Sequence, residues 1–314
     1  MNAAVRAVVR ASVWHRHEVI GIRGGYNGIF ARAFEPLDRR SVSNILQQGG
    51  TFLETGRCAR FLEPDGPAEA AAILRDKGLD ALVVIGGNGS YKGALALHQS
   101  GFPAVVGVPG SIDNDVGGTD LSIGFDTAVN TAVDAIDRIR DTAFSLERVF
   151  FVEVMGRDTG HIAAAVGLAS GAEAVIVPEE PTDIDLLTTI IDRGFEAGKR
   201  AAIFVVAEGD DAGGAARIRD RIDAATQHPL DDRVVILGYI QRGGSPTARD
   251  RILASRLGVA AVDALQSGQT AVAVGERCSE VALTPLETAV QEQPPLDLQI
   301  LRLAEILSGV RTSR

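Results

Sequence analysis

The stretch that decides the fold runs from Ala104 to Asp120 and reads AVVGVPGSIDNDVGGTD. It begins as an apolar run, which ends at Pro109-Gly110 and is followed by the hydroxyl of Ser111 and by the sequence Asp113-Asn114-Asp115. A continuous apolar run is typical of a strand that is covered on both faces of a parallel sheet. In open parallel sheets, ligands bind at the carboxyl ends of the strands. The stretch therefore predicts a buried strand that carries two carboxylates to a ligand site.

The composition is that of a globular protein, with 46% hydrophobic and 23% charged residues among 314. The formal net charge is −10, and no basic stripe is visible, which argues against a nucleic-acid partner. Two cysteines, Cys58 and Cys278, form neither a disulfide framework nor a CxxC pattern, so we expect a reduced, cytoplasmic compartment. No apolar run is long enough to span a bilayer, and the N-terminus lacks the order of a signal peptide.

Predicted helices and strands alternate along the chain, which favours a doubly wound α/β fold. No low-complexity linker divides the chain, so two domains would require it to cross between them more than once. The predicted strands are 18–22, 80–85, 105–108, 148–154, 174–177, 202–207, 233–239 and 270–274. The predicted helices are 1–14, 41–48, 68–77, 91–98, 125–142, 160–169, 185–197, 215–225, 247–266 and 296–307.

Three glycine-rich turns interrupt this pattern, RGGYNG at 23–28, GGTFLETGR at 49–57 and GGNGS at 86–90. The last lies between a predicted buried strand and a helix, where backbone N–H groups and the helix dipole favour an anion. A tight turn without a ligand explains the same residues equally well.

Several predicted strands end in a charged side chain, namely Asp113 with Asp115, Arg157, Glu208 and Arg242. A carboxylate between cations can activate a hydroxyl beside a phosphate, which is most of what phosphoryl transfer needs. Each of these residues alone could equally form an ordinary ion pair.

Four motifs carry a resemblance to a known family, GGNGSYKGA, PGSIDNDVGGTDLSIGFDTA, VEVMGRDTGHIA and IQRGGSPTARDRILASRLG. They resemble the bacterial ATP-dependent 6-phosphofructokinases, most strongly over 49–179 and 233–258. The resemblance implies a homotetramer that transfers a phosphoryl group from Mg-ATP to the C1 hydroxyl of fructose 6-phosphate. It also implies two doubly wound α/β domains, an ATP-binding domain over 1–124 and 241–291 and a sugar-phosphate domain over 125–240 and 292–314.

The resemblance assigns roles to the acceptor side of the site. Asp113 would be the general base, Ser111 would hydrogen-bond the transferring phosphoryl group in place of the usual threonine, and Arg157 would stabilise the transition-state charge. Arg148 and Arg233 would reach the sugar phosphate of a neighbouring subunit. The substrate-binding set is Asp115, Arg148, Met155, Gly156, Glu208, Arg233, Tyr239 and Arg242.

The donor side and a regulatory site are implied in the same way. ATP would contact Arg57, Cys58, Gly87, Asn88, Gly89 and Ser90, and Mg²⁺ would lie at Asn88 and Asp115. A nucleotide effector would bind at a subunit interface to Arg6, Arg10, Arg39, Arg140, Glu173 and Lys199, which otherwise read as solvated helix faces. Diphosphate-dependent relatives have an aspartate at the position of Gly89 and a lysine at that of Gly110, so the two glycines favour ATP.

Three departures from the family pattern leave alternatives open. The family begins with a strand and a GGDxxGMNA loop, so we expect the first strand to be missing here and interpret the start as one placed too late. Asn88 replaces an aspartate at the magnesium site, and Tyr239 replaces a histidine at the sugar phosphate. The alternatives are a non-catalytic regulatory subunit and a family kinase with another donor or sugar phosphate.

Overall fold

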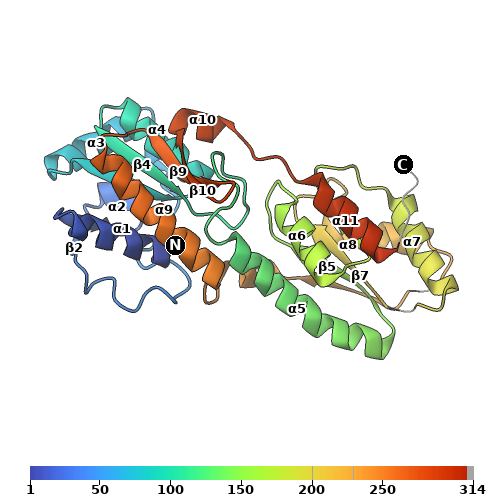
Figure 1. The fold of residues 1–314 in the computed structure, drawn as a ribbon. Helices are drawn as coiled ribbons and strands as arrows, with labels where there is room; N and C mark the ends of the chain where they lie inside the picture. Colours follow the sequence, from blue (N-terminus) through green and yellow to red (C-terminus); the bar gives the residue numbers. More distant parts are fainter. Residues whose placement is uncertain (200, 229, 310–314) are drawn as a thin grey trace. The chain divides into compact units, whose positions relative to one another are not determined.

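The computed structural model describes residues 1–199, 201–228 and 230–309. The chain forms two compact units and passes between them several times (Figure 1). Unit 1 contains Met1–Ser111, Asp115–Gly124 and Gly244–Pro294. Unit 2 contains Ile112–Asn114, Phe125–Gly243 and Pro295–Arg314. The predicted α/β class with repeated crossings is confirmed.

Unit 1 is built on a four-stranded sheet in the order β10-β9-β4-β3. Strands β3 (Ala81–Gly86), β4 (Ala104–Pro109) and β9 (Val272–Arg277) are parallel, and β10 (Glu280–Pro285) pairs antiparallel with β9. Strand β4 has neighbours on both sides, and Val105, Val106 and Val108 are fully buried. The apolar run quoted first is therefore a central strand, as predicted.

Helices cover both faces of this sheet. Val105 packs in one cluster with α3 (Gly66–Asp76) and α4 (Asn88–Gln99). Val106 and Val108 face the other way, toward α1 (Asn2–Trp14) and α9 (Ala248–Gln266). Because successive residues of a strand point to opposite faces, one apolar run supplies both cores.

Shorter elements complete unit 1. The antiparallel ribbon of β1 (Val19–Ile22) and β2 (Phe34–Leu37) encloses α2 (Tyr26–Phe30). A 3₁₀ turn, η1 (Arg60–Leu62), precedes α3, and α10 (Leu286–Gln291) follows β10.

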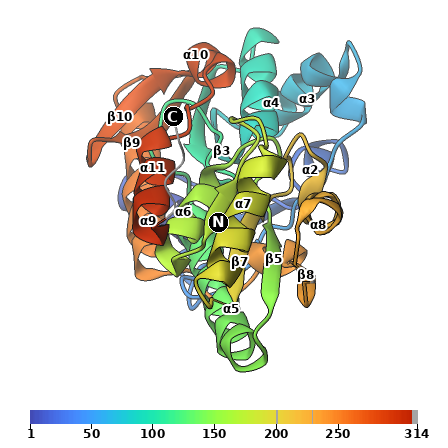
Figure 2. The same cartoon turned by 90° about the vertical axis from the view of Figure 1, so that its right-hand side faces the viewer.

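Unit 2 holds a parallel sheet in the order β6-β7-β5-β8, of which Figure 2 labels β7, β5 and β8. One face packs against α5 (Phe125–Leu146), α6 (His161–Ser170) and α11 (Leu298–Ser308). The other packs against α7 (Ile184–Glu196) and α8 (Gly214–Ala225), where Phe151 and Phe204 stack at 5.1 Å. The strands are β5 (Val149–Val154), β6 (Ala174–Ile176), β7 (Ala202–Ala207) and β8 (Asp232–Ile236). Unit 2 is thus doubly wound, as predicted.

Four local predictions are wrong, each for a physical reason. Residues 41–48 form turns rather than a helix, because the Asp38 carboxylate accepts the N–H groups of Arg40 and Ser41. The strand predicted over 233–239 ends at Ile236, and a 3₁₀ turn, η2 (Gly238–Arg242), follows.

The other two concern the sheet of unit 1. The sequence predicts β3 as a buried strand covered on both faces, and residues on each face do pack into a core cluster. The strand is nevertheless only half-buried, because it lies at the edge of the sheet within the described residues. The connector after β9 contains β10, which the sequence pattern does not predict.

Candidate active site

The donor-side group lies in unit 1, where β3 and β4 end next to each other. The N–H of Gly110, after β4, donates to the carbonyl of Gly86 at the end of β3 (2.9 Å). Helix α4 begins at Asn88, so Asn88, Gly89 and Ser90 form its first turn, three residues earlier than predicted. The first N–H groups of a helix have no partner within it and favour an anion. The predicted phosphate loop therefore lies at a helix N-terminus.

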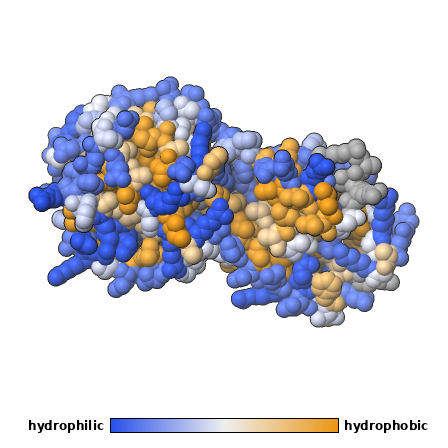
Figure 3. Space-filling model, in the orientation of Figure 1, coloured by the Kyte–Doolittle hydropathy of each residue, from blue (hydrophilic) through white to orange (hydrophobic). Residues whose placement is uncertain are grey.

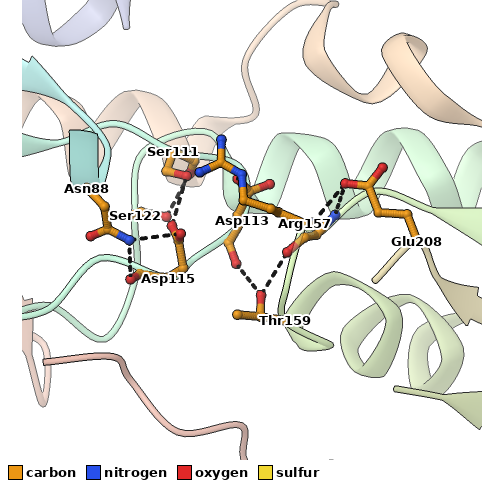
Figure 4. A network of polar contacts seen from close by, with 9 residues as sticks. Asn88, Ser111, Asp113, Asp115, Ser122, Arg157, Thr159 and Glu208 are labelled. Carbon is orange, nitrogen blue, oxygen red and sulfur yellow. Dashed lines mark hydrogen bonds and ion pairs between the residues drawn. The ribbon is translucent and has the colours of Figure 1, made fainter. Parts of the chain in front are cut away.

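Asp115 is the centre of this group (Figure 4). Asp115 is 8% exposed, and its carboxylate accepts hydrogen bonds from Asn88 Nδ2 to Oδ2 (2.9 Å) and from Ser111 Oγ to Oδ1 (3.2 Å). Asn88 Nδ2 also donates to the backbone carbonyl of Asp115 (3.0 Å). Ser122 Oγ donates to the carbonyl of Ser111 (2.7 Å) and so fixes the backbone of the loop after β4. The two predicted metal ligands are therefore in direct contact.

Two glycines shape the start of α4, one by allowing close packing and the other by leaving open space. A Cβ on Gly86 would lie 2.3 Å from Ser90 Oγ, so only glycine lets α4 start this close to β3. A Cβ on Gly89 would meet nothing within 4 Å, so the space beside the first turn of α4 is open.

The acceptor-side group lies in unit 2, in the loop after β5. Gly156 has φ +151° and Arg157 has φ +55°, a backbone region that side-chain-bearing residues seldom adopt. Glu208, directly after β7, accepts the N–H groups of Gly156 (3.3 Å) and Arg157 (2.8 Å) on Oε1. Residues held in such conformations cluster at functional sites. Glu208, predicted to contact the sugar, thus holds the loop that carries Arg157.

Asp113 belongs to the same group. Its side chain is 6% exposed, and Oδ2 lies 4.0 Å from Nε of Arg157 (Figure 4). Thr159 Oγ1 lies within hydrogen-bond distance of the carbonyls of Asp113 (3.3 Å) and Gly156 (3.0 Å). The side chain of Arg157 is 59% exposed, whereas that of Asp113 is buried. The predicted base and the predicted transition-state cation are brought together.

A second cationic group of unit 2 is formed by Arg148, Asp231 and Arg233. Asp231 accepts from Arg148 Nε (2.7 Å) and pairs with Arg233 Nη1 (2.8 Å). The hydrogen bond from Arg148, together with the charge of Arg233, holds the pKa of the Asp231 carboxyl below its usual value. The two arginines predicted to bind a neighbour's sugar phosphate are therefore adjacent.

The η2 turn carries Tyr239 and Arg242. Tyr239 is 82% exposed, and the Arg242 guanidinium lies 5.8 Å from its ring centroid. Between them, Gln241 is 1% exposed, and its Oε1 accepts the N–H of Met155 (2.9 Å). Sequence reasoning missed Gln241 as a residue that ties this turn to the loop after β5, although it lies within the quoted IQRGG motif.

The remaining predicted residues are spread more widely. Arg57 is exposed and Cys58 packs against the α3/α4 cluster of unit 1. Of the predicted effector residues, Arg6, Arg10 and Arg39 lie in unit 1, and Arg140, Glu173 and Lys199 lie in unit 2. Glu173 and Lys199 form an ion pair (2.6 Å), and Arg140 Nη2 donates to the carbonyl of Gly171 (3.2 Å). Burial and the neighbouring Arg10 lower the pKa of Arg6.

Comparison with known proteins gives the family. Residues 1–265 match the family model of phosphofructokinase. The chain belongs to the phosphofructokinase family. It is 54% identical to ATP-dependent 6-phosphofructokinase 1 of Thermus thermophilus over 98% of this chain and 95% of that protein. It is 48% identical to ATP-dependent 6-phosphofructokinase of Bacillus licheniformis, with the same coverage of both.

The solved phosphofructokinase of Saccharomyces cerevisiae has the same fold, with a TM-score of 0.85 and 34% identity. The match covers 93% of this chain and 43% of the yeast chain. The resemblance inferred from the four motifs is thereby confirmed for the phosphofructokinase family.

The donor-side residues fit a magnesium ion. Mg²⁺ in phosphoryl-transfer sites is usually bound by one or two carboxylates, substrate phosphates and waters. Asp115 offers a carboxylate, and Asn88 has its amide oxygen left to face a cation because Nδ2 is turned toward Asp115. Within the described ranges, no group of three or more His, Cys, Asp or Glu side chains could hold a metal ion. A magnesium ion at Asp115 would therefore need substrate phosphates and waters to complete its coordination.

No helix in the described part of the chain combines the length and the apolar character needed to cross a membrane.

Proposed function

We propose that this chain transfers the terminal phosphoryl group of Mg-ATP to the C1 hydroxyl of fructose 6-phosphate, as an ATP-dependent 6-phosphofructokinase of glycolysis. The observation that carries the proposal is the buried Asp113 carboxylate beside Arg157, in a chain 54% identical to an enzyme of that name. A buried carboxylate next to an exposed cation suits the activation of a hydroxyl beside a phosphate.

The proposed reaction is a direct displacement. Asp113 takes the proton of the C1 hydroxyl as that oxygen attacks the γ-phosphorus, and the bond from phosphorus to the β,γ-bridging oxygen breaks, releasing ADP. Arg157 stabilises the negative charge on the transferring group. The Ser111 hydroxyl, which donates to Asp115 in the structure, would turn to donate its one hydrogen bond to that group. Glu208 keeps Arg157 in place through the two backbone hydrogen bonds described above.

Asp115 and Asn88 would hold the magnesium ion, whose role when bound is to neutralise phosphate charge. The N–H groups of the first turn of α4 would bind phosphate oxygens. On the acceptor side, Met155, Gly156 and Arg242 would line the sugar site, and Arg148 and Arg233 would bind a sugar phosphate.

The choice of ATP over diphosphate has its own support. The open space at Gly89 leaves room for more than two phosphates beside α4. A Cβ on Gly110 would lie 2.7 Å from Sδ of Met1, which favours a small residue there.

We propose in addition that unit 1 binds ATP and unit 2 binds the sugar phosphate, in a cytoplasmic homotetramer. Exposed Leu303, Ile306 and Leu307 of α11 form an apolar patch (Figure 3), which supports a surface covered by another copy. The like-charged pair Arg6 and Arg10 on α1 supports an anionic nucleotide effector.

A coupled assay for fructose 1,6-bisphosphate with ATP or diphosphate as donor tests the function. Wild type should be active with ATP and weakly active or inactive with diphosphate. Asp113→Ser should lower kcat by about 10²–10⁴-fold, because the general base is lost.

The exposed α5 carboxylate of Asp134 provides the control, and Asp134→Ser should keep the wild-type rate. An inactive wild type would favour the alternative of a regulatory subunit. Activity unaffected by Asp113→Ser would refute the assigned role of Asp113.

A further inference from the structure

The segment RGGYNG runs from the end of β1 into the first residues of α2, and its defined conformation is not used by the proposed chemistry. Gly24 and Gly25 have φ of +87° and +61°, which favour glycine. A Cβ on Gly28 would lie 2.0 Å from the carbonyl oxygen of Arg23, so the turn closes tightly on itself. This conformation presents Tyr26 and Asn27, neighbours in sequence, to two distant parts of unit 1.

Tyr26 reaches the first turn of α4. Its hydroxyl donates to the carbonyl of Ser90 at 2.6 Å, across 64 residues of sequence. Burial raises the pKa of Tyr26, so the hydroxyl remains a neutral donor at physiological pH. Its ring packs on Phe61 with centroids 4.3 Å apart, and a Cβ on Gly93 would lie 2.6 Å from the ring. The contact is thus fixed by packing on both sides of the ring.

Asn27 reaches the second glycine-rich loop. Its Nδ2 donates to the carbonyl of Arg57 at 2.8 Å, across 30 residues of sequence. Asn27 is exposed and contributes little apolar packing, so its hydrogen bond is the main connection that it makes. Two adjacent side chains therefore hold the backbones of the two segments to which the donor-side residues Ser90 and Arg57 belong.

We propose that Tyr26 and Asn27 are positioning residues for the phosphoryl donor, which fix the segments around Arg57 and Ser90 relative to each other. The inference rests on the proposed function, since it assumes that both segments bind ATP. Neither side chain needs to touch the nucleotide. Each acts through one backbone carbonyl, and loss of one hydrogen bond corresponds to about a fivefold change in an equilibrium constant.

The test compares Tyr26→Phe, Asn27→Ala and the double variant with wild type. Tyr26→Phe removes only the hydroxyl and keeps the ring packed on Phe61 and Gly93. Asn130→Ala is the matched control, because Asn130 is an exposed asparagine of unit 2 whose Nδ2 also donates to a backbone carbonyl at 2.8 Å.

Each single variant should raise the KM for ATP about fivefold, and the double variant should raise it about 25-fold, because the two contacts hold different segments. The KM for fructose 6-phosphate should change less than twofold. Calorimetric binding of a non-hydrolysable ATP analogue with Mg²⁺ should weaken by the same factors. Amide hydrogen exchange should rise over 86–92 in Tyr26→Phe and over 54–58 in Asn27→Ala.

The outcomes separate this inference from the proposed function. If both KM values rise together, or if binding and exchange match those of Asn130→Ala, the positioning role is wrong while the kinase activity stands. If wild type binds the nucleotide analogue but does not phosphorylate fructose 6-phosphate, the proposed function fails, and the binding and exchange measurements still decide the inference. A wild type that binds no nucleotide would overturn both.

Discussion

Asn88 sets the charge around Asp115. Its amide nitrogen lies 2.9 Å from the Asp115 carboxylate, where a second carboxylate would add negative charge. Two carboxylates at that separation cannot both ionise at low cost unless a cation lies between them. An amide keeps an oxygen ligand and removes this repulsion, so the site should hold its fold without metal and bind Mg²⁺ less tightly.

Asn88→Asp should therefore lower the free Mg²⁺ needed for half-maximal rate, by about 3–10-fold, since one unit of ligand charge is added. It should also lower the melting temperature in EDTA and regain stability on addition of Mg²⁺, because the new carboxylate pair repels when no cation is bound. Rate against free Mg²⁺ and thermal unfolding with and without EDTA measure the two effects.

Asn130→Asp, on the exposed surface of α5, adds the same charge elsewhere and should change neither quantity. An unchanged magnesium requirement in Asn88→Asp would remove residue 88 from the metal site.

Tyr239 is 82% exposed, so substitutions there should affect ligand binding and leave the fold intact. Tyr239→His should lower the KM for fructose 6-phosphate about two- to threefold at pH 6, where a protonated imidazole adds a cation beside Arg242. The gain should fade as the pH rises above about 7, because an unperturbed imidazole loses its proton near pH 6.5.

Steady-state kinetics from pH 6 to 8.5 would follow this titration. Tyr239→Phe keeps the ring under the Arg242 guanidinium and should show no added pH dependence. A pH-independent KM in Tyr239→His would mean that residue 239 does not face the sugar phosphate.

At the scale of elements, the sequence predicts a helix end or a hairpin only where a local residue signal marks it. The end of α3 was predictable because Gly78, with φ +77°, is the residue type that a left-handed helix end favours. The hairpin of β9 and β10 was not, because its turn places Cys278 and Ser279 at φ +49° and +66°, where asparagine or glycine is the usual signal. Tertiary pairing with β9 overrides the weak local preference there.

The features of the candidate site also divide into those that the sequence predicts and those that it does not. Asp113 and Asn88 could be found from the sequence, because each follows an apolar strand. The direction of the Asn88 amide and the contact of Gln241 with Met155 could not, because they depend on segments 27 and 86 residues apart that only the folded sheets bring together.

Two loops of unit 2 pack so closely that one of them needs glycine. A Cβ on Gly209 would lie 2.0 Å from the carbonyl oxygen of Arg157 and 3.3 Å from the Cα of Asp158. Both obstacles are backbone atoms, so the loop after β5 must move if a side chain is added. That loop carries Arg157 and is held by Glu208, the neighbour of Gly209.

Gly209→Ala should raise the KM for fructose 6-phosphate about tenfold and destabilise unit 2 by about 1–3 kcal/mol, the usual cost of overpacking. The KM for ATP should change much less. Kinetics for both substrates and urea unfolding measure these effects.

Gly194→Ala in α7 is the control, because a Cβ there meets nothing within 4 Å and alanine favours a helix. It should keep the activity and gain some stability. Equal effects of the two substitutions would show that the contact between the loops does not position Arg157.

At the scale of the whole molecule, the proposed homotetramer raises the question of whether Arg148 and Arg233 serve the site of their own chain or that of a neighbouring copy. Both are paired with Asp231, and Arg148 and Arg233 are 26% and 51% exposed in their side chains. Asp231 neutralises part of their charge and keeps them adjacent. If they bind the sugar phosphate of a neighbouring copy, each site depends on two chains, one supplying Asp113 and the other supplying the arginines.

Mixing two inactive variants tests this dependence. Asp113→Ser removes the base, and Arg233→Ala removes one phosphate-binding cation while the pair of Arg148 and Asp231 is retained. Each variant alone should be nearly inactive at low fructose 6-phosphate.

After dissociation and reassembly of equal amounts, half of the interfaces should join unlike chains, and each of those should contain one site with both defects and one site with none. Activity should therefore return to about a quarter of the wild-type value, the share of intact sites for random pairing across a two-fold interface. Native mass spectrometry of differently tagged chains confirms that mixing has occurred. Mixed assemblies that stay inactive would show that Arg233 serves the Asp113 of its own chain.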